Sequence, residues 1–176
     1  MARIPLVHVE DMDSRQRAQY ERFPSNLTRT LTLLDPRLSE ALPATANALR
    51  TSGLDAGLRE GVILRVAALT GSAYERMQHL DQARLTGWSD DAIAAIEAGD
   101  HDGLPDGVAR VLRFVDALVD GGPVGDELFD ATRAVLSDRD LTTVIVLVGH
   151  YITVALLTVV LDVDLDPEPD SWTHEH

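Results

Sequence analysis

Apolar positions recur every three or four residues along most of the chain, the spacing that gathers them on one face of an α-helix. A run of leucines shows this spacing between residues 25 and 52. Valine, leucine and isoleucine repeat it in 55–70 and 107–119. Only 159–165 alternates between apolar and polar residues as a half-buried strand does, and that segment suits the end of a helix equally well. The pattern predicts an all-α chain.

Residues that start or interrupt helices divide the first third of the chain. Asp13 or Ser14 is expected to cap a short amphipathic helix that follows an extended N-terminal arm. Proline lacks a backbone donor and clashes with the preceding turn of a helix. Pro36 and Pro43 are therefore expected to break 25–52 into two or three short helices.

The remaining boundaries follow from small polar residues and glycines. Asp55 is expected to cap one helix and Ser72 the next, which Gly87 ends. Further helices are expected at 89–99, 107–119, 126–136 and 141–161. We therefore expect a single-domain bundle of about seven helices over residues 1–166, followed by a flexible acidic tail at 167–176.

The stretch 141–161 is long enough to cross a lipid bilayer, because it holds 21 residues without a formal charge. A core or interface helix of an all-α oligomer has the same composition. The flanking residues favour the second interpretation, since Asp138, Asp140 and Asp162 surround the stretch and only Arg139 offers a positive anchor. We expect no membrane span.

Composition excludes several classes of function. The net charge of -14 repels nucleic acid and anionic lipid, because phosphate binding relies on basic side chains. All basic residues are arginine, which rules out a side-chain lysine as Schiff base or general base. The absence of cysteine rules out disulfides, thiolate nucleophiles and thiolate metal sites. The N-terminus shows no secretory signal, so a cytoplasmic protein is expected.

Three side chains on two consecutive predicted helices suit acid–base chemistry. Glu75 and His79 are four residues apart on one helix face, close enough to interact. A carboxylate beside an imidazole fixes its tautomer and raises its pKa, which would make His79 a general acid or base near neutral pH. Glu60, on the preceding helix, would hold His79 or relay a proton.

Each of these residues also has a purely structural explanation. Ser72 begins an S-x-x-E sequence, which forms a capping box at many helix starts. His79 could be a hydrogen-bonded core histidine. Glu60 could pair with Arg59 or Arg65.

Other polar residues are candidates for contacts with a ligand. Ser72, Tyr74 and Arg76 are candidates for binding the substrate. Tyr74 and Arg76 are expected to face it, since arginine is the natural partner of a carboxylate. His150 lies in an apolar run, where a polar group needs a partner, so it either lines the pocket with His79 or pairs across a subunit interface. The remaining histidines are expected at the surface: His8, His101, His174 and His176.

The segment 58–79, LREGVILRVAALTGSAYERMQH, resembles the core motif of the carboxymuconolactone decarboxylase / alkylhydroperoxidase D-like superfamily. In its peroxidase branch the motif is a glutamate, eleven residues, a cysteine, two residues, a second cysteine, three residues and a histidine. Glu60 and His79 match the glutamate and the histidine, while Ser72 and Glu75 stand at the cysteine positions. The resemblance extends over nearly the whole chain, through the segments 1–5, 136–139 and 147–151.

The resemblance implies a helical fold, assembly into trimers or hexamers, and a small-molecule substrate. Without the cysteine pair, a thiol peroxidase is excluded. The decarboxylase side of the superfamily remains, with no cofactor and no metal. Its implied substrate is a small cyclic or aromatic-derived carboxylic acid or lactone.

Loss of carbon dioxide leaves a carbanion or dienolate, which His79 as imidazolium would protonate while Glu75 and Glu60 orient it and keep it charged. The alternative is a non-catalytic oligomeric binding or scaffold protein that kept the fold. A pocket that contains His79 and is open to solvent would favour the enzyme; a dry, closed polar network would favour the scaffold.

Overall fold

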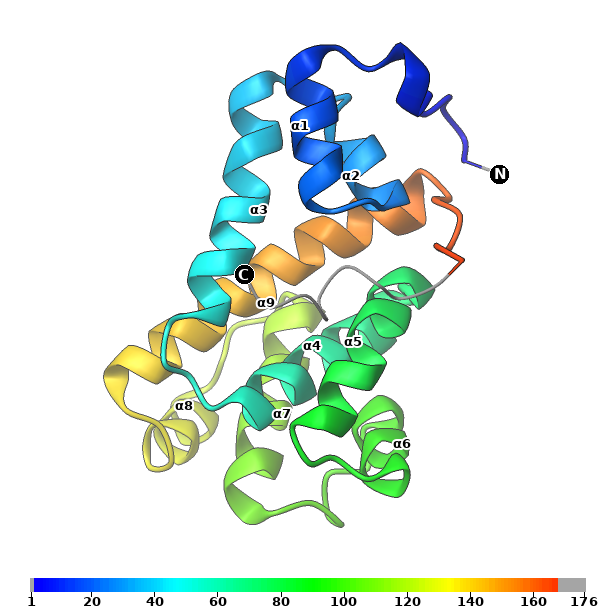
Figure 1. Cartoon of the computed structure of the whole chain (residues 1–176). Coiled ribbons are helices and arrows are strands. Elements are labelled where there is room, and N and C mark those ends of the chain that lie inside the picture. Colours follow the sequence, from blue (N-terminus) through cyan, green and yellow to red (C-terminus); the bar gives the residue numbers. More distant parts are fainter. Residues whose placement is uncertain (1, 168–176) are drawn as a thin grey trace.

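The computed structural model describes residues 2–167, and within that range all regular secondary structure is helical (Figure 1). The expected all-α class is confirmed. The described part has nine α-helices rather than about seven. After a 3-10 turn at Val9–Asp11, the helices are α1 (Ser14–Arg22), α2 (Asn26–Leu31), α3 (Pro36–Arg50), α4 (Ala56–Thr70), α5 (Ala73–Leu85), α6 (Asp90–Ala98), α7 (Asp106–Asp120), α8 (Asp126–Arg133) and α9 (Asp138–Val160).

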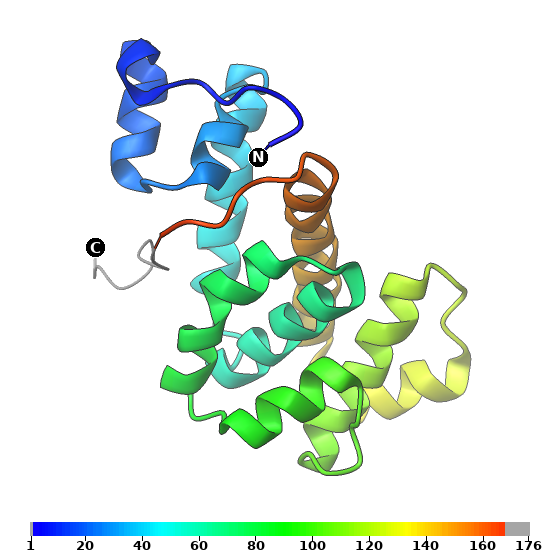
Figure 2. The same cartoon turned by 90° about the vertical axis from the view of Figure 1, so that its right-hand side faces the viewer.

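Helix α4 is the centre of the molecule and packs against α5, α6, α7 and α9. Helices α1, α2 and α3 lie at one end, whereas α6, α7 and α8 lie at the other (Figures 1 and 2). The two ends are connected through α9, which packs against both α3 and α4. This arrangement places α5 and the middle of α9 opposite the group formed by α1, α2 and α3.

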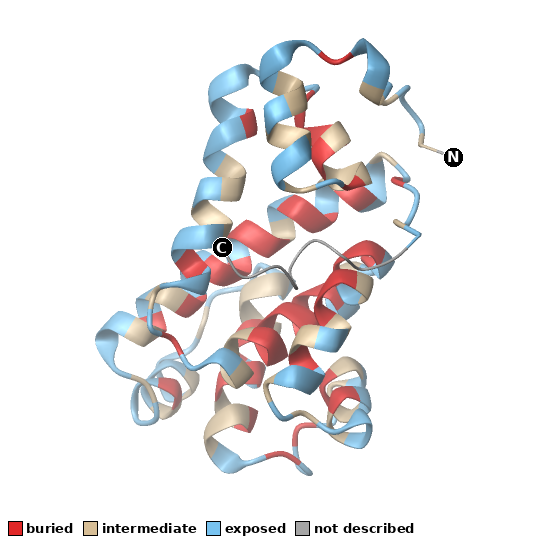
Figure 3. Ribbon diagram, viewed as in Figure 1, coloured by how far each residue is buried: buried red, intermediate tan, exposed pale blue. Residues whose placement is uncertain are grey.

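Helix α4 is buried on all sides rather than on one face. Every residue from Glu60 to Ala67 is buried, as the central band of Figure 3 shows. The amphipathic pattern expected for 55–70 is therefore wrong in part, and Leu69, assigned to the apolar face, is 39% exposed. A helix surrounded by neighbours carries its polar side chains into the interior, so Glu60 and Arg65 need partners there.

The expected helix caps are present. Asp13, rather than Ser14, caps α1 by accepting hydrogen bonds from two backbone N–H groups. Asp55 caps α4 through the N–H of Leu58. Between α4 and α5, Gly71 adopts a left-handed conformation with φ of 69°, which favours glycine. This tight connection brings the end of α4 directly to the start of α5.

Pro43 was expected to break a helix, but α3 continues through it. Proline leaves the carbonyl four residues earlier without its helical donor, and here that carbonyl belongs to Ser39. The Gln19 side chain supplies the missing donor, because its Nε2 donates to Ser39 O at 2.7 Å. The Ser39 hydroxyl in turn donates to Gln19 Oε1 at 2.7 Å. Helix α1 thus compensates for the proline in α3.

His101 is buried, which corrects its expected place at the surface. Its Nε2 lies 2.8 Å from Asp116 Oδ2, and the other oxygen of Asp116 accepts from Arg65 Nε at 2.6 Å. Arg65 also donates to the backbone carbonyl of Glu97 at 2.9 Å. This network ties α4 to α6, to the following loop and to α7. His8 is exposed as expected, whereas His174 and His176 lie outside the described residues.

The segment after α9 turns back across the molecule. Asp162 has a positive φ of 51°, and Arg3 N donates to Leu161 O at 2.8 Å. Asp166 then accepts from the backbone N–H of Asn26 at 2.8 Å, at the start of α2. Both ends of the described chain are therefore held near the C-terminal end of α9. The tail expected at 167–176 lies, apart from Pro167, outside the described residues.

By length and composition alone, α9 would be able to cross a membrane, and it is the single helix of residues 2–167 that passes this test. Of its most apolar window, 44% is buried inside the protein. The buried positions of α9 pack against α3, α4, α5 and α7. A large part of its apolar surface thus serves the protein core.

Candidate functional site

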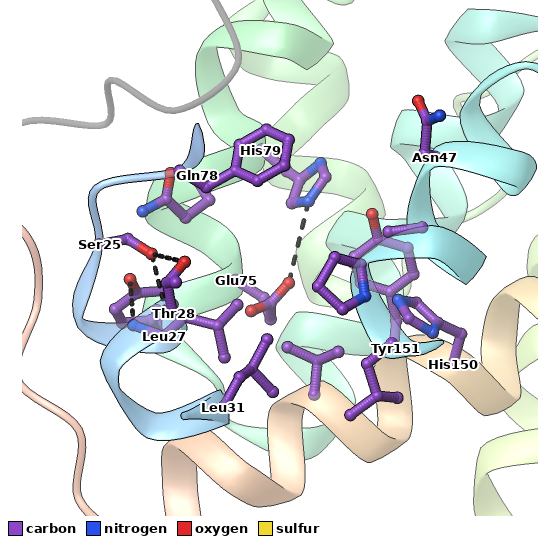
Figure 4. Close-up of a pocket in the computed structure, with 16 residues that line it drawn as sticks. Ser25, Leu27, Thr28, Leu31, Asn47, Glu75, Gln78, His79, His150 and Tyr151 are labelled. Atoms are coloured by element: carbon purple, nitrogen blue, oxygen red, sulfur yellow. Dashed lines mark hydrogen bonds and ion pairs between the residues drawn. The ribbon is translucent and has the colours of Figure 1, made fainter. Parts of the chain in front are cut away.

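A cavity of about 80 Å³ lies where the α1–α2 connection, α3, α5 and α9 meet (Figure 4). It is partly open to solvent, and its walls are mostly apolar. Polar groups are concentrated on α5 and α9. The lining residues are Phe23, Ser25, Leu27, Thr28, Leu31, Leu42, Pro43, Ala46, Asn47, Tyr74, Glu75, Gln78, His79, His150, Tyr151 and Val154.

His79 is held from behind the cavity by Glu60. The two side chains are buried, and His79 Nδ1 lies 2.8 Å from Glu60 Oε2. The other oxygen of Glu60 accepts from Arg59 Nε at 3.0 Å. Burial alone raises the pKa of Glu60, but the hydrogen bond and charge of His79 and the Arg59 guanidinium outweigh it, so this pKa lies below its ordinary value. An ionised Glu60 keeps a proton on Nδ1 and directs Nε2 to the opposite side.

Glu75 lies on that opposite side, within the cavity. Its Oε2 is 3.8 Å from His79 Nε2, so the pair interacts without a close hydrogen bond. Among the described residues its Oε1 has no hydrogen-bond partner. Burial raises the pKa of Glu75 to about 7, although the charge of His79 acts to lower it. Glu75 therefore exists as both acid and carboxylate at neutral pH.

His150 and Tyr151 form the α9 wall of the cavity (Figure 4). The Tyr151 ring stands edge-on to His79, with ring centroids 5.1 Å apart, and edge-on to His150 at 5.2 Å. Burial lowers the pKa of His150, and the charge of nearby His79 lowers it further. Of the two positions considered for His150, the structure places it in the pocket.

Tyr74 lines the cavity, but its hydroxyl is already engaged. It donates to the Asp166 carboxylate and accepts from the backbone N–H of Leu27 at 3.0 Å. Gln78 Nε2 donates to the same carboxylate at 2.8 Å. The pKa of Tyr74 is raised, mainly by burial and to a smaller extent by the hydrogen bond to Asp166. Tyr74 and Gln78 thus fasten the C-terminal segment over one side of the site.

Two expected site residues lie away from the cavity. Ser72 caps α5 by accepting from the Glu75 N–H at 3.2 Å, and its hydroxyl lies 3.0 Å from that of Thr158. Arg76 points away from the cavity and pairs with Glu97 at 2.6 Å, with its side chain 49% exposed. The expectation that Arg76 faces the substrate is corrected, because the residue after Glu75 turns by about 100° around the helix.

A second cavity, of about 20 Å³, lies behind His79. His79 and Tyr151 line both cavities. Arg50, Arg59 and Glu60 line only the smaller one. The pair of His79 and Glu60 therefore spans the wall between a mostly apolar cavity and a charged one. Glu60 contacts the imidazole without lining the larger cavity.

Sequence reasoning missed Gln78 and the walls contributed by α2 and α3. Gln78 precedes His79 and follows Tyr74 by four residues, so helical spacing already placed it on the same face of α5. Ser25 and Asn47 offered no such signal, because they reach the cavity only through packing between distant helices. Within residues 2–167, no cluster of three histidine or acidic side chains is arranged to hold a metal ion.

Comparison with known proteins agrees with this fold. Residues 36–120, which include Glu60, Glu75 and His79, match the model of the Carboxymuconolactone decarboxylase family. No curated protein matches the chain. An uncharacterised peroxidase-related protein from Ralstonia eutropha JMP134, solved as an alkylhydroperoxidase AhpD core, is similar in structure with a TM-score of 0.81 and 17% identity, covering 96% of this chain and 94% of that one.

Two further solved structures are similar. One is a protein of unknown function from Agrobacterium tumefaciens, with a suggested AhpD-type antioxidant role (TM-score 0.69, 24% identity, 76% of this chain and 94% of that one). The other is a cysteine-to-alanine variant of the debrominase Bmp8 in complex with 2,3,4-tribromopyrrole (TM-score 0.73, 11% identity, 96% of each chain). Residues 36–120 of the chain thus resemble the carboxymuconolactone decarboxylase family, and the chain has the alkylhydroperoxidase D-like fold without any cysteine.

Proposed function

We propose that this protein is a cofactor-independent acid–base enzyme that decarboxylates a small cyclic or aromatic-derived acid or lactone. One observation carries the proposal: Glu75, His79 and Glu60 form a chain of buried titratable groups that ends in a partly open, mostly apolar cavity. A histidine in a closed polar network would not contact such a space. The open cavity therefore favours an enzyme over a scaffold.

The cavity suits a small ring. Its walls are mainly aliphatic and aromatic side chains, and its polar groups converge from α5 and α9. The debrominase Bmp8, which is similar in fold, binds 2,3,4-tribromopyrrole, and this supports a small ring as the ligand here. None of the arginines lines the cavity. A carboxylate that enters loses its water without gaining an arginine partner, which favours its conversion into neutral carbon dioxide.

The reaction then requires one proton transfer to carbon. As the bond to the carboxylate carbon breaks, its electron pair stays on the substrate as a carbanion or dienolate. His79 Nε2–H donates a proton to that carbon, while the Glu60 carboxylate on Nδ1 stabilises the imidazolium before transfer. The product leaves with a new C–H bond, and solvent returns a proton to the imidazole.

Turnover by variants of His79 tests the proposal. Small cyclic and aromatic acids are incubated with the protein in D₂O, and carbon dioxide release and deuterium at the product carbon are measured. His79→Gln is expected to lower kcat by a factor of about 10² or more, the usual contribution of a general acid. His8→Gln serves as the control, since His8 is exposed and does not line the cavity. Full activity in His79→Ala with an unchanged circular dichroism spectrum would sink the assignment.

A further inference from the structure

Glu75 has the one carboxylate oxygen among residues 2–167 that is buried and lacks a hydrogen-bond partner. Glu75 is only 3% exposed, and Oε1 itself makes no bond. A buried acceptor without a donor is costly, so native proteins seldom keep one without a functional reason. The oxygen is therefore a sign that something absent from the free chain donates to it.

The position of Glu75 shows where that donor comes from. In Figure 4 its carboxylate lies in the middle of the cavity, between the apolar wall of α2 and the rings of α9. The hydroxyls of Ser25 and Thr28 are 3.0 Å apart and bond to each other. The Tyr74 hydroxyl donates to Asp166. A molecule in the cavity is thus the natural donor to Glu75 Oε1.

We infer that the ligand of this cavity is a small, mainly apolar ring that carries a hydroxyl or ring N–H group and donates it to Glu75 Oε1. The inference rests on the proposed function only because it places the ligand in the same cavity. It adds Glu75 to His79 as a second residue that contacts the ligand. An ionised carboxylate accepts hydrogen bonds and cannot donate them. A carboxylate group alone would leave Oε1 unpaired and would face a like charge.

When the ring also bears a carboxylate, the hydroxyl or N–H permits a second order of steps, in which the carbon is protonated before carbon dioxide leaves and no free carbanion forms. The hydroxyl or N–H proton moves to Glu75, and the electron pair left on oxygen or nitrogen raises the electron density of the ring. His79 Nε2–H protonates the ring carbon that bears the carboxylate. The bond to that carboxylate breaks, carbon dioxide leaves, and the electron pair restores the ring. Glu75 returns its proton to the oxygen or nitrogen, and solvent reprotonates His79.

Binding to Glu75 must depend on pH, and the sign follows from its surroundings. The titratable groups that line the cavity with it are Tyr74 and His79 on α5 and His150 and Tyr151 on α9, whereas α2 and α3 contribute none. With a pKa of about 7, Glu75 becomes ionised as the pH rises from 6 to 8. The carboxylate is the better acceptor, so a donor ligand is expected to bind more tightly at pH 8 than at pH 6.

The test compares phenol with toluene, which has the same shape and no donor. Dissociation constants are measured by ligand-observed NMR titration for the wild type, Glu75→Leu and the exposed control Glu21→Gln. The preference for phenol over toluene is expected to fall about 10-fold or more in Glu75→Leu and to be unchanged in Glu21→Gln. Glu75→Gln is expected to remove the rise in phenol affinity between pH 6 and pH 8.

An unchanged preference in Glu75→Leu, or failure of phenol to bind the wild type at millimolar concentration, would overturn the inference. Thermal melts establish that each variant is folded before titration. The binding test needs no turnover, so it separates the two proposals. A Glu75-dependent preference for phenol without any decarboxylation would leave the ligand assignment standing and remove the proposed reaction.

Discussion

Glu75 illustrates a conflict between stability and chemistry at the scale of a single residue. Its carboxyl group is buried beside His79, yet one oxygen has no partner among the described residues. Burial raises its pKa from the ordinary 4.5 to about 7, which means that the folded protein holds a proton the unfolded chain releases. Functional sites commonly keep such destabilising groups because the chemistry requires them.

This shift predicts how stability depends on pH. Well below pH 4.5 the group is protonated in both states, so it does not make stability depend on pH there. Between pH 4.5 and 7 the unfolded chain binds fewer protons than the folded one, so stability falls as the pH rises and stays low above 7. Urea unfolding of Glu75→Gln and wild type at pH 4.5 and pH 8 is expected to show the variant gaining roughly 3 kcal/mol relative to the wild type. A difference that stays constant with pH would contradict the assignment.

The residues of the site differ in how far the sequence could predict them. Spacing alone placed Glu75 and His79 on one face of a helix, and the tight connection at Gly71 brings Glu60 to the same imidazole. Ser72 was identified both as a cap and as a site residue, and the structure uses it as a cap. Which side of α5 faces the cavity depends on the packing of α2, α3 and α9, and local pattern does not contain that information.

At the scale of elements, α3 and α4 show the limits of local rules. Pro43 was expected to end a helix, but a side chain of α1 supplies the missing donor. Helix α4 was expected to be amphipathic, but neighbours on all sides bury it. In both cases a contact between elements distant in sequence overrides the local preference. The N-caps were predictable because each cap bonds to residues two or three positions away.

The compensation of Pro43 can be tested with a double-mutant cycle. Gln19→Ala leaves the Ser39 carbonyl without its donor and is expected to cost about 1 kcal/mol of unfolding free energy. In a Pro43→Ala background the backbone N–H of residue 43 takes over, so the same change is expected to cost less. Urea unfolding of the four proteins measures both values. Equal costs in the two backgrounds would show that the Gln19 side chain does not compensate for the proline.

At the scale of the whole molecule, α9 both fills the core and leaves an apolar surface. One face packs inside the protein and contributes His150 and Tyr151 to the cavity. The opposite face forms an exposed stripe at helical spacing, made of Thr142, Val146, Gly149, Thr153, Leu156 and Val160. Ile145 and Val159, which are also exposed, widen it. Helix α9 therefore carries more apolar surface than the rest of this chain buries.

An exposed apolar face of this length is a typical site of self-association. A Cβ added to Gly149, which lies within the stripe, would meet no neighbouring atom within 4 Å, so a second helix is able to approach closely there. We therefore predict that the protein forms a homo-oligomer through the exposed stripe of α9. This contact is separate from the cavity, whose α9 residues lie on the buried face.

Light scattering coupled to size-exclusion chromatography measures the predicted assembly. The wild type is expected to elute as an oligomer, and Val146→Glu combined with Leu156→Glu is expected to shift it towards the monomer, because charges in an apolar contact lose their hydration. Leu85→Glu on α5 is the matched control: Leu85 is 74% exposed and lies outside the stripe, so its variant should keep the wild-type mass. Circular dichroism distinguishes dissociation from unfolding. A monomeric wild type would contradict the prediction, whereas an oligomer that survives both glutamates would place the contact on a different surface.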